Sequence, residues 1–268
     1  MSVKFFSLAS GSSGNCYYLG NEEYGILIDA GIGPRTIKKR LRDKGVRMEQ
    51  IMALLITHDH TDHIKYAGVL GEKCGIPVFS TETVHNGMAR NVCMAEKIEA
   101  SRRVLAKEIP FRLRDFCITA FEVPHDGSDN VGYYITWGAE SFAIATDLGH
   151  ISCGVANYMK KANYIVIEAN YDAEMLNSGP YPAYLKTRIT QGKGHLCNDE
   201  TAVFLSSIYH PGLTHIFLCH LSHENNHPEL AYKTVAIKFQ QNGISVGSHL
   251  TLVSLPRTSV SDVYTLGD

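Results

Sequence analysis

Three histidines and two aspartates lie within one short segment of this chain, Thr57-His58-Asp59-His60-Thr61-Asp62-His63. The segment directly follows the apolar run at residues 51–56, which is short, uncharged and typical of a buried strand. Such a loop requires a fold that presents polar groups at the end of a sheet. Histidine and carboxylate are ligands of Zn, Mn and Fe. A tight turn would direct His58 and His60 one way and Asp62 and His63 another, so the segment predicts two adjacent metal ions. The alternative is a solvated loop with incidental histidines.

The rest of the chain alternates predicted strands and helices. Strands are predicted at residues 3–8, 16–19, 24–29, 51–56, 77–79, 117–123, 131–137, 141–146, 164–167 and 215–219. Helices are predicted from Pro34 to residue 44 and at residues 65–74, 83–91, 198–209 and 228–241. His58, His125, Asp147 and His220 each stand just past a predicted strand. This row predicts one α/β domain, residues 1–268, in which two mixed sheets are flanked by helices and carry the site on loops.

Composition sets limits on the protein class. The chain has 268 residues, 44% hydrophobic and 19% charged, as expected of a globular protein. A net charge of -2 gives no global basic field, so nucleic-acid binding would need local patches or metal. No apolar stretch has the length of a signal peptide or a spanning helix, which predicts a cytoplasmic protein without membrane contact. The seven cysteines form no Cys-x-x-Cys pair, and most are expected to be small buried hydrophobes.

Three segments allow two interpretations each. The basic run at residues 36–44 indicates a solvated helix face or a contact with a nucleic-acid backbone. The small-residue turn at residues 10–15 is a structural turn or a phosphate cradle that lacks the P-loop lysine. Residues 177–193 combine tyrosines with Lys186, Arg188 and Lys193. They form either a lid that stacks on bases and holds phosphates or a plain surface helix.

Taken together, these motifs resemble the metallo-β-lactamase superfamily, whose mark is His-x-His-x-Asp-His followed by a distant His, an Asp and a last His. The resemblance spans the chain from the Asp29-Ala30-Gly31 turn to His220. It implies the αββα sandwich of that superfamily. It also implies a ligand set divided over two metals: His58, His60 and His125 for the first, Asp62, His63 and His220 for the second, and Asp147 bridging. His223 and His227 compete with His220, but the position of His220 directly after an apolar strand favours it.

Later motifs resemble one branch of the superfamily. Gly194-His195-Leu196 and His220-Leu221-Ser222 look like the phosphodiesterase branch, in which the equivalent of His195 approaches the scissile phosphate. The opening segment at residues 7–15 and the closing segment at residues 220–230 resemble more closely the YycJ/WalJ family, regarded as 5′-to-3′ DNA exonucleases. The 47 residues between Asp147 and His195 are too few for the inserted domain of β-CASP nucleases. Cys219, where relatives often carry a hydroxyl, is either a packing residue or one that perturbs the site.

The resemblance implies a dinuclear phosphodiesterase that acts on DNA. Two metals would lower the pKa of a bridging water and clamp the transition state. Asp62 would accept a proton, and His195 would contact the phosphate and protonate the departing oxygen. Asp29 and Glu168 are candidates for orienting these groups, although Glu168 is equally well read as a surface carboxylate. The ligands suit Zn, Mn or Fe alike. The alternatives are a small-molecule phosphodiesterase of the phosphonate-pathway kind, a thioester or lactam hydrolase, and a non-catalytic binding protein.

Overall fold

The first sheet is seven-stranded and mixed in the computed structural model, which describes residues 1–247 and 249–267. The strands are β1 (Val3–Ala9), β2 (Cys16–Gly20), β3 (Gly25–Ile28), β4 (Ile51–Leu55), β5 (Val78–Thr81), β6 (Arg102–Leu105) and β14 (Tyr264–Leu266). Their spatial order is β14-β1-β2-β3-β4-β5-β6, antiparallel up to β3 and parallel from β3 to β6. Because β3 and β4 are parallel neighbours, the segments that follow them leave the sheet at the same edge.

This sheet belongs to the first of two compact units, called here the N-terminal unit. It comprises Met1–Ile109, Gly127–Asn130 and the chain from Pro256 onward. Its helices are α1 (Pro34–Asp43), the short 3₁₀-helix Met48–Gln50, α2 (Thr61–Ile64), the π-helix Val69–Lys73 and α3 (Glu82–Arg90). Helix α1 begins with proline at its first turn and buries Ile37 and Leu41, as the i, i+4 spacing predicts.

The stretch predicted as a helix at residues 65–74 is different in detail. A one-turn helix, α2, precedes it, and residues Val69–Lys73 are π-helical. The prediction of one regular helix is therefore wrong, and the second half of the histidine segment lies on α2 rather than in a loop. The π-helical turn still buries Leu70 and Gly71, so its apolar pattern is used for packing.

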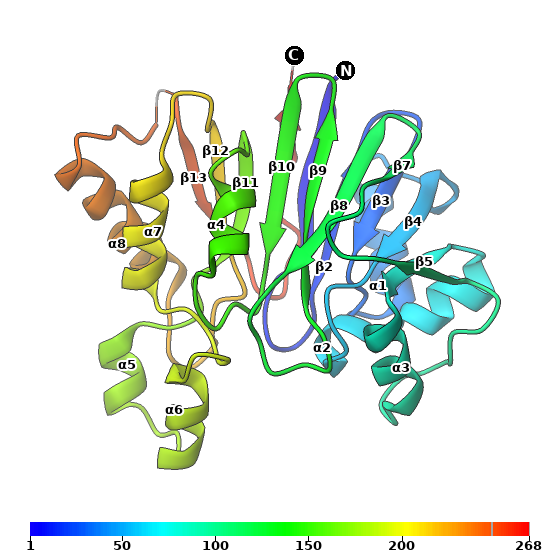
Figure 1. Cartoon of the computed structure of the whole chain (residues 1–268), viewed down its shortest axis with the longest axis horizontal. Coiled ribbons are helices and arrows are strands. Elements are labelled where there is room, and N and C mark those ends of the chain that lie inside the picture. The colour runs from blue at the N-terminus through cyan, green and yellow to red at the C-terminus, as the bar shows by residue number, and fades with distance from the viewer. Residues whose placement is uncertain (248, 268) are drawn as a thin grey trace. The chain divides into compact units, whose positions relative to one another are not determined.

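The second unit, called the C-terminal unit, comprises Pro110–Asp126 and Val131–Leu255. Its sheet contains β7 (Phe111–Leu113), β8 (Phe116–Glu122), β9 (Val131–Trp137), β10 (Glu140–Ala145), β11 (Tyr164–Glu168), β12 (His215–Cys219) and β13 (Thr251–Ser254). The order is β13-β12-β11-β10-β9-β8-β7, with parallel pairing from β10 to β13 (Figure 1). Three neighbouring parallel strands, β10, β11 and β12, therefore end at one edge.

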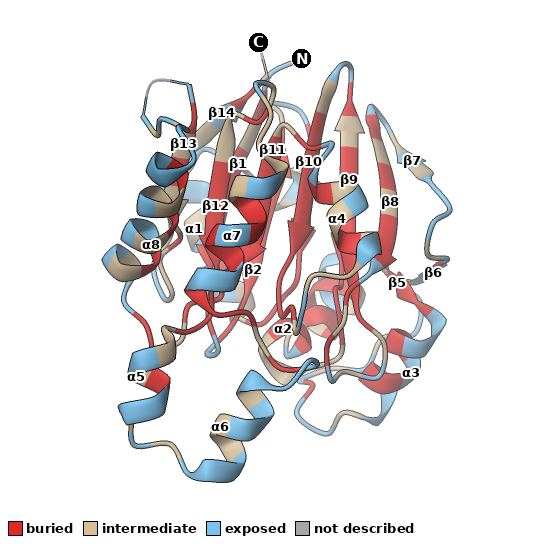
Figure 2. Ribbon diagram, turned by 60° about the vertical axis from the view of Figure 1, so that its left-hand side comes forward, coloured by how far each residue is buried: buried red, intermediate tan, exposed pale blue. Residues whose placement is uncertain are grey.

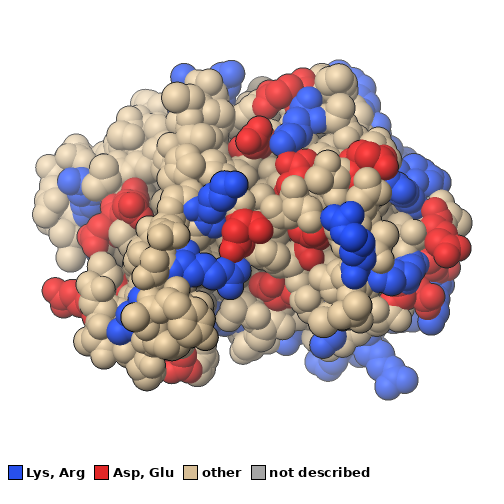
Figure 3. Space-filling view, turned by 60° about the horizontal axis from the view of Figure 1, so that its bottom comes forward, with Lys and Arg blue, Asp and Glu red and all other residues tan. Residues whose placement is uncertain are grey.

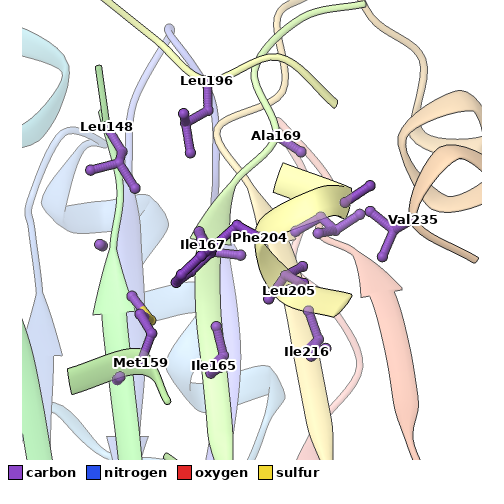
Figure 4. Packing of buried hydrophobic residues seen from close by; sticks show 14 of the residues in the cluster. Leu148, Met159, Ile165, Ile167, Ala169, Leu196, Phe204, Leu205, Ile216 and Val235 are labelled. Carbon is purple, nitrogen blue, oxygen red and sulfur yellow. The ribbon is translucent and has the colours of Figure 1, made fainter. Parts of the chain in front are cut away.

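Helices of the C-terminal unit are α4 (Cys153–Met159), α5 (Ala173–Ser178), α6 (Ala183–Thr190), α7 (Asn198–Ile208) and α8 (Pro228–Gln241). Leu205 of α7 and Val235 of α8 pack with Ile165, Ile167 and Ile216 of the sheet in one buried cluster (Figure 4). Burying each such side chain contributes about 1.5–3 kcal/mol. Helix α6 differs, because no residue of it is buried (Figure 2).

These observations decide several sequence predictions. Two mixed sheets with helices are confirmed, whereas the grouping of both units into a single domain of residues 1–268 stays a prediction. The expectation that most cysteines are buried is wrong: Cys16, Cys197 and Cys219 are buried, one is intermediate and three are exposed. Among the helices of residues 1–247 and 249–267, none combines the length and the apolar character that crossing a bilayer requires.

Candidate active site

Three acidic or imidazole residues at strand ends adopt a backbone conformation that non-glycine residues seldom use. Asp29 after β3 has φ 62°, and Asp147 after β10 and His220 after β12 both have φ 53°. A non-glycine residue in the left-handed region costs on the order of 1–3 kcal/mol and persists where the surroundings determine it. Such residues concentrate at functional sites. The three positions were singled out from the sequence, and they share this conformation with Glu108 and Arg114, which are not among the candidate site residues.

The histidine segment changes from extended backbone to helix at its centre. His60 has φ -69° and ψ 145° and caps α2, on which Asp62 and His63 lie. The His58 ring centroid lies 4.7 Å from that of His60 and 4.1 Å from that of His63. His58 and His63 are buried, while His60 and Asp62 are partly accessible. His60 thus lies on extended backbone and His63 on a helix, yet both rings lie close to that of His58.

Asp29 and Thr57 form hydrogen bonds that support the histidine segment. Thr57 donates from its backbone nitrogen to Asp29 Oδ1 at 2.9 Å and from its hydroxyl to Oδ2 at 2.9 Å. The Nδ1 atom of His63 lies 2.8 Å from Asp29 Oδ2. Burial raises the pKa of Asp29, and the neighbouring His63 together with the Thr57 hydrogen bonds offsets part of that shift. An imidazole that donates Nδ1–H to a carboxylate presents Nε2 as a ligand atom, so this contact suits the orienting role predicted for Asp29.

Asn15, at the end of the small-residue turn, was not singled out from the sequence. Its side-chain amide lies 3.1 Å from Asp62 Oδ2 and 3.0 Å from His63 Nε2. Its backbone nitrogen donates to the Asp62 carbonyl at 2.8 Å. The turn therefore supports the histidine segment, a role that follows from contacts across 47 positions and has no local sequence signal.

In the C-terminal unit, Glu168 is the centre of the site. It is the last residue of β11, is fully buried, and accepts four hydrogen bonds. Its Oε1 atom lies 2.8 Å from Nδ1 of His195 and 2.8 Å from Nδ1 of His220. Its Oε2 atom accepts from the backbone nitrogens of Leu148 at 2.8 Å and Leu196 at 3.1 Å. The reading of Glu168 as a surface carboxylate is wrong, because one buried carboxylate joins both imidazoles.

The charges of this group reinforce one another. Burial alone would raise the pKa of Glu168, but the adjacent His195 and the hydrogen bonds from both imidazoles outweigh it and lower that pKa. Burial alone would lower the pKa of His195, but Glu168 and Asp147 outweigh it and raise that pKa. Glu168 remains ionised and fixes Nδ1 as the donor in both rings. The Nε2 atoms of His195 and His220 are consequently the ones directed to a ligand.

His125 and Asp147 complete the donors of this unit. The Nδ1 atom of His125 lies 2.9 Å from the carbonyl oxygen of Gly194, just before His195. Asp147 accepts from the Thr146 hydroxyl at 2.8 Å, and its Oδ1 atom lies 3.4 Å from Nδ1 of His220. Asp147, Glu168, His195 and His220 each offer a ligand atom, and these atoms all lie within 4.8 Å of one another. Imidazole nitrogen and carboxylate oxygen fit a divalent first-row ion. Since Glu168 Oε1 already accepts from both Nδ1 atoms, Asp147 and the imidazole Nε2 atoms are the donors here that could reach a metal or a substrate.

The structure also separates the three candidate histidines near residue 220. His220 is buried against Glu168. His223 is exposed and lies 2.7 Å from Glu224 through its Nδ1 atom. His227 caps α8, where its Nδ1 accepts from the backbone nitrogen of Glu229. The geometry agrees with the preference for His220. Cys219 is fully buried in β12, which favours its interpretation as a packing residue.

Of the three cations suggested for substrate contact, two contact other groups of the protein and one is exposed. Arg188 of α6 binds Asp126, with Nε at 2.8 Å and an Nη atom at 2.7 Å from the carboxylate. Lys186 donates to the carbonyl of Asn177 at 2.7 Å. Lys193 is exposed in the loop after α6. The face in Figure 3 shows basic and acidic side chains interspersed rather than one continuous basic field. The lid interpretation stays a prediction, with Arg188 and Lys186 already engaged by the protein itself.

Comparison with known proteins places the chain in a family. Residues 24–216 match the model described as beta-lactamase superfamily domain. The protein named exodeoxyribonuclease YycJ of Bacillus anthracis is 33% identical over 248 residues, which cover 92% of this chain and 93% of the relative. The protein named exodeoxyribonuclease WalJ of Streptococcus pneumoniae is 34% identical over 244 residues, 91% of each chain.

A solved structure supports the fold assignment. The metallo-beta-lactamase fold protein YhfI from Bacillus subtilis matches with a TM-score of 0.70, at 16% identity, over 99% of this chain and 100% of that one. At this identity the likeness concerns the fold alone, and it confirms the predicted fold class. The strand-end residues, the matched family model and the full-length relatives thus agree. The chain belongs to the β-lactamase superfamily and, within it, to the family of the YycJ and WalJ proteins.

Proposed function

We propose that this protein is a divalent-metal-dependent exonuclease that hydrolyses phosphodiester bonds of DNA from the 5′ end. Membership of the YycJ and WalJ family makes the chain a hydrolase of phosphodiester bonds, since these relatives are named exodeoxyribonucleases. The substrate, the direction and the use of two ions are the proposal. The ions are Zn, Mn or Fe, because the ligand types suit all three.

The observation that carries the proposal is the position of Glu168. This one carboxylate holds both His220, a proposed metal ligand, and His195, which the family pattern does not use as a ligand. The carboxylate thereby positions His195 next to the proposed ligand His220, and His195 stays available to the substrate. Phosphodiester hydrolysis is accelerated by such a group, because the departing oxygen takes up a proton.

The proposed division of ligands follows the family pattern. One ion would be held by His58, His60 and His125, the other by Asp62, His63 and His220, and Asp147 would serve both. Divalent ions in such a set supply a nucleophile near neutral pH and offset the charge that grows on the phosphoryl oxygens. We also propose that residues 1–268 function as one domain, because the matched family model runs from residue 24 to 216 and so takes in parts of both units.

The protein's own residues would move the protons. Asp62 is partly accessible, and its Oδ2 atom is positioned by the Asn15 amide, so its carboxylate can accept the proton that water loses. His195 donates Nδ1–H to Glu168, and its Nε2 atom then delivers a proton to the oxygen that leaves phosphorus. One phosphorus–oxygen bond forms to water and one breaks, which yields a phosphate monoester and a hydroxyl. General acid catalysis of this kind contributes about 10²–10⁴ in rate.

The test uses DNA labelled separately at each end. Protein loaded with Zn, Mn or Fe is incubated with single- and double-stranded DNA. We expect early release of a short labelled product from the 5′ label and progressive shortening of the 3′-labelled strand. Asp62→Ala should abolish this cleavage, whereas the control His223→Ala, at an exposed position, should retain it. Turnover of a small cyclic phosphodiester without DNA cleavage would refute the nuclease proposal in favour of a small-molecule phosphodiesterase. Full activity of Asp62→Ala would refute the role given to Asp62.

A further inference from the structure

A basic pocket of about 260 Å³ lies in the N-terminal unit, outside the candidate metal ligands. Cations from three separate segments line it: Arg40 of α1, Lys65 directly after α2, and Arg257 of the C-terminal segment. Ser13 and Tyr66 also line it. Among the described residues that line the pocket there is no Asp or Glu. The wall is therefore suited to an anion.

The pocket is built on the same backbone as the histidine segment. The nitrogen of Ala30 donates to the His63 carbonyl at 2.6 Å, and the nitrogen of Tyr66 donates to the Ala30 carbonyl at 3.0 Å. Gly31, which lines the pocket, lies so close to this segment that a Cβ atom there would be 1.6 Å from the Asp62 carbonyl oxygen. Gly31 therefore has to be glycine. Gly31 thus both lines the pocket and packs against the Asp62 backbone.

The basic run of α1 divides into two kinds of residue. Lys39 is exposed and binds Asp43 of the same helix at 2.7 Å, as a solvated helix face predicts. Arg40 is partly buried and donates to the carbonyl oxygens of Leu8 and, at 2.5 Å, of Thr258. These bonds fix the guanidinium at the pocket without neutralising its charge, because both acceptors are uncharged. The Lys65 ammonium lies 5.7 Å from the centroid of the Tyr66 ring.

We propose that this pocket binds a phosphate of the substrate strand other than the one that is cleaved. The inference rests on the proposed nuclease function and adds to it a contact that positions the strand. A backbone phosphodiester carries one negative charge and a terminal phosphate close to two at neutral pH. The three cations and the absence of carboxylates in the wall suit either form. Within the α1 basic run, this gives Arg40 the nucleic-acid interpretation, while Lys39 belongs to the solvated face.

The experiment compares Lys65→Gln and Arg257→Gln with the control Lys39→Gln, all in metal-loaded full-length protein. Each phosphate contact on a single strand contributes about 0.7 to the slope of log KM against log salt concentration. We expect each pocket variant to raise KM and to reduce that slope by up to about this amount, because the cations share one phosphate, and the control to match the wild type. If only 5′-phosphorylated strands lose affinity, the pocket holds the terminal phosphate. If strands with 5′-phosphate and 5′-hydroxyl lose affinity equally, it holds an internal one.

A second measurement does not depend on cleavage. A single-stranded oligonucleotide with a phosphorothioate backbone is added, and amine acetylation at Lys65 and Lys39 is compared by mass spectrometry. Protection of Lys65 alone supports the pocket, even in a protein that fails to cleave DNA and so refutes the nuclease proposal. Unprotected Lys65 together with wild-type KM and salt slope in both pocket variants would overturn the pocket and leave the nuclease proposal standing.

Discussion

Replacing Glu168 by glutamine changes few atoms and tests the centre of the site. The carboxylate accepts four hydrogen bonds, two from backbone nitrogens and two from imidazole Nδ1 atoms. A glutamine amide has one oxygen, which can face only one of these pairs, and its NH₂ group must face the other. If NH₂ faces the imidazoles, His195 and His220 have to move their proton from Nδ1 to Nε2. The protonated Nε2 of His220 can then no longer bind a metal.

The size of the effect of Glu168→Gln on metal affinity, stability and rate follows from these two orientations of the amide. With NH₂ toward the imidazoles, loss of the orienting partner lowers metal affinity by about 10–100-fold. With NH₂ toward the backbone, two buried N–H groups lose their acceptor, at about 1–3 kcal/mol each, so the protein loses about 2–6 kcal/mol of stability. Both arrangements remove the negative charge that raises the pKa of His195, and loss of a general acid costs about 10²–10⁴ in rate. Glu168→Gln should therefore lower kcat/KM on DNA by at least about 10²-fold.

The assay combines three measurements on purified protein: metal affinity by competition with a chelator, kcat/KM on end-labelled DNA, and urea unfolding. A matched control is Thr201→Val, which removes a 2.7 Å hydrogen bond from the Thr201 hydroxyl to the backbone oxygen of Glu168 but touches neither imidazole. The control should lose about 1 kcal/mol of stability and keep its metal affinity. Glu168→Gln with wild-type metal affinity and wild-type kcat/KM would refute the assignment of Glu168 as the residue that positions both rings.

Three further outcomes test other parts of the structure. His220→Ala should lower the bound metal measured by elemental analysis, and His223→Ala should not; equal losses would contradict the choice between them. The Glu72 carboxylate accepts hydrogen bonds from the Ser101 hydroxyl and nearby backbone nitrogens, which lower its pKa from 4.5 to about 2. The stabilising contribution of this carboxylate is present above pH 4.5 and disappears as the pH falls toward 2. Glu72→Gln should therefore flatten the dependence of unfolding free energy on pH in that range. An unchanged dependence would contradict the stabilising role of the Glu72 carboxylate. Leu205→Ala, in the buried cluster, should cost about 2–5 kcal/mol in urea unfolding, and a loss below about 1 kcal/mol would show that the helix packing is misjudged.

Much of the fold was readable from local patterns. Apolar runs such as residues 51–56 and 215–219 predicted buried strands, and Pro34 with the Ile37 and Leu41 spacing predicted α1, because each pattern is contained within one segment. The short strands β6, β7, β13 and β14 were not predicted. Each has only three or four residues, too few for an alternation to be distinct. The same brevity hid α4, which spans seven residues.

In the candidate site too, some features were predictable from the sequence and others depend on the tertiary structure. The sequence by itself determined which groups are candidates, because the spacing of His58, His60, Asp62 and His63 and the residues after each strand are visible in the chain. Tertiary structure decided which of them share a partner. It placed Glu168 between His195 and His220, and it brought Asn15 to Asp62. These pairs are separated by 27, 52 and 47 positions, and hydrogen bonds over such separations depend on how the strands order themselves in a sheet. Local sequence records the donor and the acceptor, and only the packed sheet sets the distance between them.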